Sequence, residues 1–167
     1  MNPHFNVLFI GGGNAGLSAS AHLLLKRPGL NVGIIEPSSK HYYQPAWTLV
    51  GGGVYDIQDT EREEKDYIPK GATWIKEYAE TFEPEQNRVI TKEGHTYTYD
   101  YLVVCPGIQL NWSAIKGLPE TLGKNGVTSN YSFKYAPYTF ECLSSFKGGR
   151  MIFHSPNTPV KCGGAPQ

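Results

Sequence analysis

The hydrophobic pattern at the start of the chain predicts a strand, a helix and a second strand. Residues 5–10 form a mostly apolar, β-rich run that ends abruptly in three glycines, which is typical of a buried parallel strand. Residues 17–26 are mostly small or apolar and suit a helix against a sheet, and Pro28-Gly29 ends that helix. A second apolar run, residues 31–35, predicts another strand that finishes at Glu36.

The middle of the chain predicts β-structure of a different kind. We expect one strand over residues 72–82, and a hairpin formed by residues 88–91 and 96–99 around a turn. Residues 99–107 then return to a buried strand that ends in Pro106-Gly107. The pattern therefore predicts a parallel sheet with a small antiparallel insertion.

Two further segments are less regular. Residues 59–66 carry a run of mixed charges, most simply the solvated face of a short helix. Residues 149–154 predict a short strand, followed by a turn and a helix start at residues 163–166. The strand predicted for residues 149–154 lies where a second dinucleotide-binding turn would begin. Residues 156–159 replace its glycine fingerprint, so no pyridine nucleotide is expected there and a quinone fits better as electron acceptor.

The three glycines after the first strand begin a dinucleotide-binding motif. Residues 11–16 (GGGNAG) fit G-x-G-x-x-G, and Glu36 follows the last glycine at the offset expected for a ribose-binding acid. Gly11 permits the tight turn, Gly13 lets a pyrophosphate approach, and Gly16 lets the helix press on the strand. Glu36 would accept hydrogen bonds from ribose hydroxyls and repel a 2′-phosphate, which favours FAD or NAD over NADP. The alternative is a glycine-rich turn that holds no ligand.

The segment after Glu36 favours FAD over NAD. A simple NAD domain would continue with further strand–helix units, but residues 37–47 form an aromatic loop broken by prolines. Glycines 51–53 follow, and they could bring backbone close to a flat ring system. The alternative reading of this region is an ordinary surface loop.

Composition excludes several classes of protein. The 167 residues suffice for one domain and the start of another at about 150 residues per domain. The net charge is +0, from 15 basic and 15 acidic residues, so nothing indicates a nucleic-acid partner. No apolar run approaches the roughly 18 residues of a membrane-spanning helix, and no targeting segment is evident. The histidines have no ligand-like spacing, so no metal site is expected, although His41 could contact the cofactor.

The three cysteines are too few and too scattered for a disulfide-stapled secreted domain. Cys105 ends an apolar strand and Cys142 falls on a predicted helix, so both are expected to be packing thiols. Cys162 lies beside Lys161 near a predicted helix start, which would push the thiol toward the reactive thiolate. An inert buried cysteine is the alternative.

Three segments resemble one family, the sulfide:quinone oxidoreductases, and the similarity covers the whole chain. They are residues 41–45 (HYYQP), residues 129–132 (SNYS) and residues 156–167 (PNTPVKCGGAPQ), and they are closest to the mitochondrial-type branch and its bacterial relatives. The resemblance implies FAD as cofactor, sulfide and quinone as substrates, and Cys162 as one half of a disulfide facing the flavin. It also implies a persulfide intermediate and peripheral membrane contact through regions absent from this chain, at a bacterial cell membrane or in the cytoplasm.

Motif and resemblance together define the expected site. The catalytic residue is Cys162, and the 106–107 turn resembles the element that closes the FAD domain of such flavoproteins. The expected cofactor-binding residues are Gly11, Gly13, Asn14, Ala15, Gly16, Glu36, Pro37, Gln44, Pro45, Tyr78, Ala79, Pro106 and Gly107.

We therefore predict an α/β fold, a three-layer Rossmann-like FAD-binding domain, followed by the start of a second nucleotide-domain-like unit. The expected boundaries are 1–112 for the FAD-binding part, 113–148 for a connecting segment and 149–167 for the second unit. The family's second cysteine should lie beyond Gln167, so we expect this chain alone not to turn over sulfide and quinone. The alternatives are a flavoprotein like type II NADH dehydrogenase or flavocytochrome sulfide dehydrogenase, and a non-catalytic fragment that binds FAD or a partner.

Overall fold

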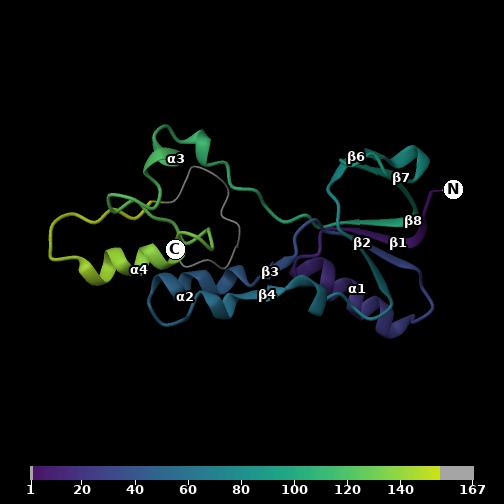
Figure 1. Ribbon diagram of the computed structural model, residues 1–167, viewed down its shortest axis with the longest axis horizontal. Coiled ribbons are helices and arrows are strands. Elements are labelled where there is room, and N and C mark those ends of the chain that lie inside the picture. The colour runs from purple at the N-terminus through teal and green to yellow at the C-terminus, as the bar shows by residue number, and fades with distance from the viewer. Residues whose placement is uncertain (1, 155–167) are drawn as a thin grey trace.

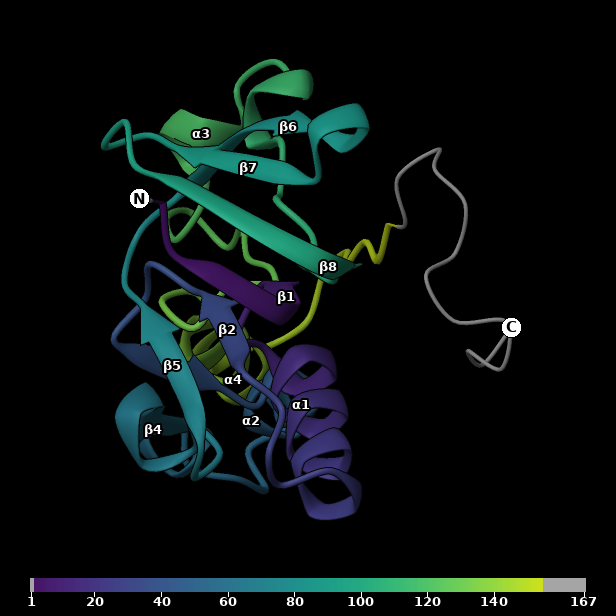
Figure 2. The same cartoon turned by 90° about the vertical axis from the view of Figure 1, so that its right-hand side faces the viewer.

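The computed structural model describes residues 2–154 and is built around one six-stranded sheet (Figures 1 and 2). The strand order is β5-β2-β1-β8-β7-β6. The six strands are β1 (His4–Ile10), β2 (Val32–Ile35), β5 (Ala72–Ile75), β6 (Ala79–Glu83), β7 (Arg88–Thr91) and β8 (Thr96–Val104). The prediction at Cys162 lies outside the described residues.

The first half of the sheet is parallel, as predicted. β1 pairs in parallel with β2 on one side and β8 on the other, and β2 pairs in parallel with β5. Helix α1 (Asn14–Lys26) buries Leu17 and Leu24 against Phe9 and Ile34, while Leu8 belongs to a separate core cluster. Burial on both faces explains why the first two strands read as nearly continuous apolar runs rather than as alternating ones.

The antiparallel strands are present as predicted, and they are joined to the same sheet. β8 is nine residues long and serves both as the second strand of the predicted hairpin and as the predicted return strand. Its first residues pair antiparallel with β7, and the strand pairs in parallel with β1 along most of its length. One strand can do both because it has two hydrogen-bonding edges.

The single strand predicted over residues 72–82 is wrong. This segment contains two strands, β5 and β6, which lie at opposite edges of the sheet (Figure 2). The chain turns sharply between them, where the Glu77 N–H donates to the Ile75 carbonyl at 2.9 Å. A continuous run of β-forming residues does not reveal this change of direction.

The short helix predicted for residues 59–66 is also wrong. The segment consists of a 3-10 turn at Gln58–Thr60, the strand β4 (Glu61–Glu63) and a second 3-10 turn at Glu64–Asp66. β4 pairs antiparallel with β3 (Lys40–Tyr42), and the Lys40 ammonium lies 2.7 Å from Glu61 and 2.6 Å from Glu63. The alternating charges therefore belong to a two-stranded ribbon.

A smaller lobe forms beyond this ribbon. Helix α2 (Trp47–Gly51) and helix α4 (Ala136–Ser145) lie together away from the main sheet (Figure 1). Their core contains Trp47, Val50 and Ala136, so part of the predicted connecting segment packs against the earlier part of the chain. A side chain at Gly53 would overlap the ring of Phe140, so the flat ring near these glycines belongs to the protein itself.

The remaining described elements are short. Helix α3 (Leu118–Thr121) follows a 3-10 turn at Trp112–Ala114. The strand predicted for residues 149–154 is absent, and Ile152 and Phe153 are 78% and 80% exposed. A strand needs a neighbour for its hydrogen bonds, and no described strand supplies one here. Within residues 2–154, no helix is both long enough and apolar enough to cross a membrane.

Candidate cofactor site

The glycine turn lies at the carboxyl ends of the parallel strands, between β1 and α1. Gly11 has a φ of +104°, and a side chain there would overlap the carbonyl oxygen of Cys105 at the end of β8. A side chain at Gly16 would in turn overlap the carbonyl oxygen of Gly11. Both glycines are therefore required by close approach of backbone to backbone, which gives the turn its tight geometry.

The next residues leave an open cradle at the start of α1. Gly13, Asn14 and Ala15 are exposed, and nothing lies within 4 Å of the position that a Gly13 side chain would take. No side chain caps the helix, so its first N–H groups remain free to bind an anion. The shape and polarity of this cradle fit the pyrophosphate of a dinucleotide.

Glu36 is fixed beside this cradle by two backbone donors. Its Oε2 accepts a hydrogen bond from the Gly12 N–H at 2.8 Å, and its Oε1 accepts one from the Ser38 N–H at 2.7 Å. The Glu36 carbonyl accepts a further bond from Trp74 Nε1 at 2.8 Å. A carboxylate oxygen has more than one acceptor site, so both oxygens can still accept ribose hydroxyls. These residues therefore fit the adenosine half of FAD.

The structure brings some of the other predicted residues to this turn. Pro106 Cα lies 3.0 Å from the position of a Gly11 side chain, and Gly107, at φ +74°, has open space where a side chain would be. Ala79 packs against the core cluster that contains Ile10 and Ile35, the last residues of β1 and β2. Pro106 therefore lies at the glycine turn, whereas Ala79 pairs with Thr91 near the other end of β8.

Other predicted residues lie apart from the turn or point outward. Gln44 and Pro45 form the 3-10 turn that leads into α2, in the smaller lobe. Pro37 follows Glu36 directly and is partly buried. Tyr78 is 57% exposed, and Lys92 lies over its ring at 5.5 Å.

Cys105 and Cys142 occupy the places expected of packing thiols. The Cys105 Sγ lies 3.6 Å from the Gly11 carbonyl oxygen, and burial raises the pKa of this thiol, which disfavours the reactive thiolate. Cys142 lies on α4 as predicted. Among residues 2–154, no group of three or more His, Cys, Asp and Glu side chains is arranged to hold a metal ion.

Sequence reasoning missed Glu64, whose carboxyl group lies against the glycine turn next to Glu36. Glu64 is only 1% exposed, and its Oε1 lies 2.5 Å from the position that a Gly12 side chain would take. Its Oε2 lies 3.2 Å from Nδ1 of His41. Burial raises the pKa of the Glu64 carboxyl, an effect that Glu36 reinforces and His41 opposes. The one available signal was Gly12, because the dinucleotide motif does not require a glycine at this position.

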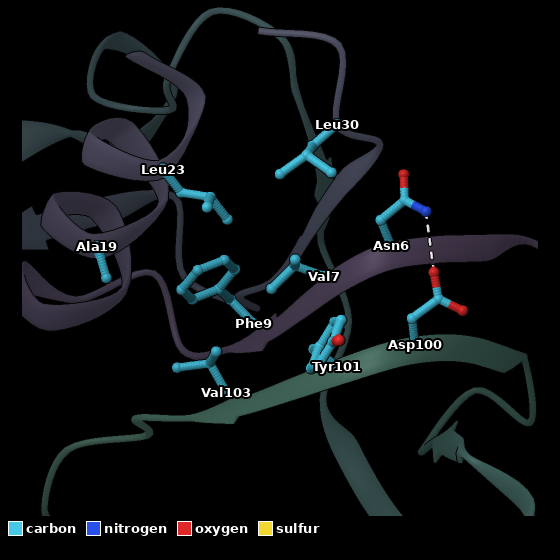
Figure 3. A pocket seen from close by; sticks show the side chains of 9 residues that line it. All are labelled: Asn6, Val7, Phe9, Ala19, Leu23, Leu30, Asp100, Tyr101 and Val103. Atoms are coloured by element: carbon cyan, nitrogen blue, oxygen red, sulfur yellow. Dashed lines mark hydrogen bonds between the residues drawn. The ribbon is translucent and has the colours of Figure 1, made fainter. Parts of the chain in front are cut away.

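A separate pocket of about 510 Å³ lies on the α1 side of the sheet (Figure 3). Apolar side chains from α1, β1 and β8 line most of it, and at its rim Asn6 donates to Asp100 at 2.9 Å. Its lining residues are Asn6, Val7, Phe9, Ala19, Leu23, Leu30, Asp100, Tyr101 and Val103. None of these residues belongs to the glycine turn, so this pocket is distinct from the cofactor cradle.

Comparison with known proteins agrees with this geometry. The sequence model of the pyridine nucleotide-disulphide oxidoreductase family matches residues 5–138. The chain belongs to this family. Its members are FAD-binding flavoproteins, and the glycine turn with Glu36 is the part of the chain that fits this cofactor.

Several similar curated proteins are sulfide:quinone oxidoreductases. The mitochondrial enzyme of Dictyostelium discoideum is 54% identical over 164 residues, covering 96% of this chain and 36% of the relative. The mitochondrial enzyme of Mus musculus is 42% identical over 164 residues, covering 98% of this chain and 36% of the relative. The chain thus spans little more than a third of the length of these relatives.

Solved structures support the same assignment. The sulfide:quinone oxidoreductase of Aquifex aeolicus superimposes with a TM-score of 0.67 at 26% identity, over 85% of this chain and 32% of that one. NDH2 from Plasmodium falciparum gives a TM-score of 0.60 at 14% identity, over 84% of this chain and 28% of that one. The second likeness shows the fold alone.

Proposed function

We propose that this chain provides the FAD-binding part of an enzyme that oxidises sulfide and passes the electrons to a quinone. The observation that carries the proposal is the Glu36 carboxylate, held by the Gly12 and Ser38 N–H groups beside an open helix N-terminus. FAD, when bound, supplies the two-electron relay between sulfide and quinone. The residues of this chain hold its adenosine and pyrophosphate.

The substrates are proposed from the relatives. Proteins 54% and 42% identical over nearly the whole chain are named sulfide:quinone oxidoreductases. The alternative of a type II NADH dehydrogenase rests only on a likeness of fold, and residues 156–159 lack the glycines that an NADH-binding turn uses. We therefore favour sulfide and quinone as substrates.

Cys162 is the proposed redox thiol of the complete enzyme. We propose that it forms a disulfide with a cysteine outside this chain. Attack by HS⁻ would break that bond, form a persulfide on one sulfur and release the other as a thiolate that carries the electron pair. Transfer of the persulfide's outer sulfur to a nucleophilic acceptor would let the two cysteines re-form their disulfide. This closure would release two electrons, which bound FAD would relay to the quinone together with two protons.

The proposed setting is peripheral attachment to a membrane, where a quinone is available. Both relatives described above are named mitochondrial, so the bacterial location expected from the sequence stays a prediction. The boundaries at residues 1–112, 113–148 and 149–167 also remain a proposal. Within the second of these segments, α4 packs on α2.

Two measurements test this function. The purified 167-residue chain, saturated with FAD and freed of excess ligand, should retain the visible absorption bands of flavin. In the complete enzyme, Cys162→Ser should retain flavin but lose sulfide-dependent quinone reduction, whereas Cys142→Ser should keep both. Full activity of Cys162→Ser would refute the proposed role of this thiol.

A further inference from the structure

Two glutamate side chains meet at the position that a Gly12 side chain would take, and only one of them has a role in the dinucleotide motif. Glu36 accepts the Gly12 N–H, while Glu64 approaches the same residue from β4 and the turn that follows it. A side chain at Gly12 would meet Glu64 Oε1 at 2.5 Å and Glu36 Cγ at 2.7 Å. Glycine is therefore needed here because both carboxylates press against the backbone.

The Glu64 carboxyl group is buried with one oxygen unsatisfied. Its Oε1 has no hydrogen-bond partner, and the side chain is 2% exposed. Its Oε2 is paired with His41, whose side chain is 13% exposed and whose ring stacks on Tyr67 at 5.5 Å. An isolated buried carboxylate is costly, so this pair is stable when it shares a proton and has no net charge.

The charged groups near the pair include Arg62, the cross-strand partner of His41, which is exposed and donates to the Glu61 carbonyl oxygen at 2.7 Å. Glu36 repels a Glu64 carboxylate and His41 attracts it. Lys40, the neighbour of His41 on β3, forms ion pairs with Glu61 and Glu63 on β4 rather than with Glu64. A proton lost from the pair would therefore leave a second negative charge beside Glu36 without compensation.

We propose that the Glu64–His41 pair is a proton-dependent positioning element that holds Gly12 and Glu36 in the geometry required for FAD. While the pair keeps its proton, it has no net charge, and Glu36 stays bound to the Gly12 N–H. When the proton is lost, repulsion between the two carboxylates pushes Glu36 from this position and weakens binding of the adenosine half of FAD. This inference rests on the proposed FAD-binding function. We assign Glu64 a positioning role that acts through Gly12 and Glu36, because its carboxyl group is buried against Gly12.

The test is the FAD dissociation constant of the 167-residue chain at a series of pH values upward from 4.5, the ordinary pKa of the Glu64 carboxyl, measured by quenching of flavin fluorescence. The wild-type affinity should fall by about tenfold across this range, which corresponds to a coupling of about 1.4 kcal/mol. Glu64→Gln has the same shape but cannot ionise, so its affinity should change by less than about twofold. Asp66→Asn, an exposed change on the same turn, should behave like the wild type.

A second readout does not need FAD. The 15N and 1H shifts of the Gly12 amide report its hydrogen bond to Glu36, so they should titrate in the wild type and not in Glu64→Gln. If Glu64→Gln fails to fold, His41→Asn replaces it, and the Gly12 titration should then move to a different pH.

The outcomes separate this inference from the proposed function. Parallel pH profiles for the wild type and Glu64→Gln, with normal FAD binding, would overturn the inference alone. A wild-type chain that bound no FAD at any pH would overturn both. An unresponsive Gly12 amide in the wild type would overturn the coupling between Glu64 and Glu36.

Discussion

The two carboxylates that meet at Gly12, those of Glu36 and Glu64, come from segments that differ in how the sequence encodes them. The glycine turn and Glu36 come from a single strand–helix–strand unit within 26 positions, from Gly11 to Glu36. Glu64 arrives from a charged segment after a two-stranded ribbon and is buried to 1% exposure. The first segment has a local sequence motif and the second has none. A motif therefore located the cofactor, but tertiary structure decided what surrounds it.

The largest expected effect comes from Gly11→Ala, which tests the tight packing of the glycine turn. The substitution places a methyl group against the Cys105 carbonyl at a φ of +104°, so it should lower the free energy of unfolding by about 2–4 kcal/mol. Urea unfolding followed by circular dichroism measures this loss. A stability equal to that of the wild type would show that the turn is looser than the structure indicates.

Gly13→Ala should separate binding from stability at the same turn. Gly13 has a φ of −68° and open space around it, so alanine should keep the fold or stabilise it by up to about 1 kcal/mol. The new methyl group would occupy the space left for the pyrophosphate, so FAD affinity should fall by about tenfold. FAD titration of both variants checks this, and unchanged affinity would place the phosphates elsewhere.

The pH dependence of stability tests the Glu64 part of this comparison. Because burial raises the pKa of Glu64 above its ordinary value of 4.5, the folded chain keeps a proton that the unfolded chain has released. The free energy of unfolding should therefore fall as the pH rises above 4.5, and level off once Glu64 ionises in the folded state. Glu64→Gln should lack this decline, as urea unfolding at a series of pH values would show. Equal declines in both proteins would assign the effect to another group.

The smallest effect is expected at the exposed charges that flank Glu64. Lys40→Met removes the ion pairs to Glu61 and Glu63, but water screens these partly exposed groups. The thermal midpoint and the FAD dissociation constant should both match the wild type within error. A clear loss of FAD binding would mean that Lys40 contributes to the site, and that the electrostatic account of Glu64 is incomplete.

The sequence predicted the parts of the fold that depend on local patterns. The strand of residues 5–10, the helix before Pro28 and the acid Glu36 follow from apolar periodicity and fixed motif spacing. The segment of residues 72–82 was misread because its composition suits a strand throughout, while its chain direction depends on which sheet edge each half joins.

The mistaken helix at residues 59–66 has a similar cause. The run of charges predicts a solvated helix face, but pairing with β3 places Glu63 opposite Lys40, and the Lys40 ammonium also reaches Glu61, the cross-strand partner of Tyr42. Glu64 then enters the interior because the chain bends after β4, where its N–H donates to the Ser39 carbonyl at 2.9 Å. The residue pattern of 59–66 alone does not encode this contact, because Ser39 lies 25 positions earlier in the chain.

The most direct test of the cofactor site compares two acidic residues. Glu36→Ala removes the carboxylate at the turn, and Glu85→Ala removes an exposed one on the 3-10 turn Pro84–Gln86. After saturation with FAD and gel filtration, the wild type and Glu85→Ala should retain the flavin absorption bands, and Glu36→Ala should lose them. Flavin retention by all three chains, or by none, would contradict the account of Glu36 as the residue that holds FAD.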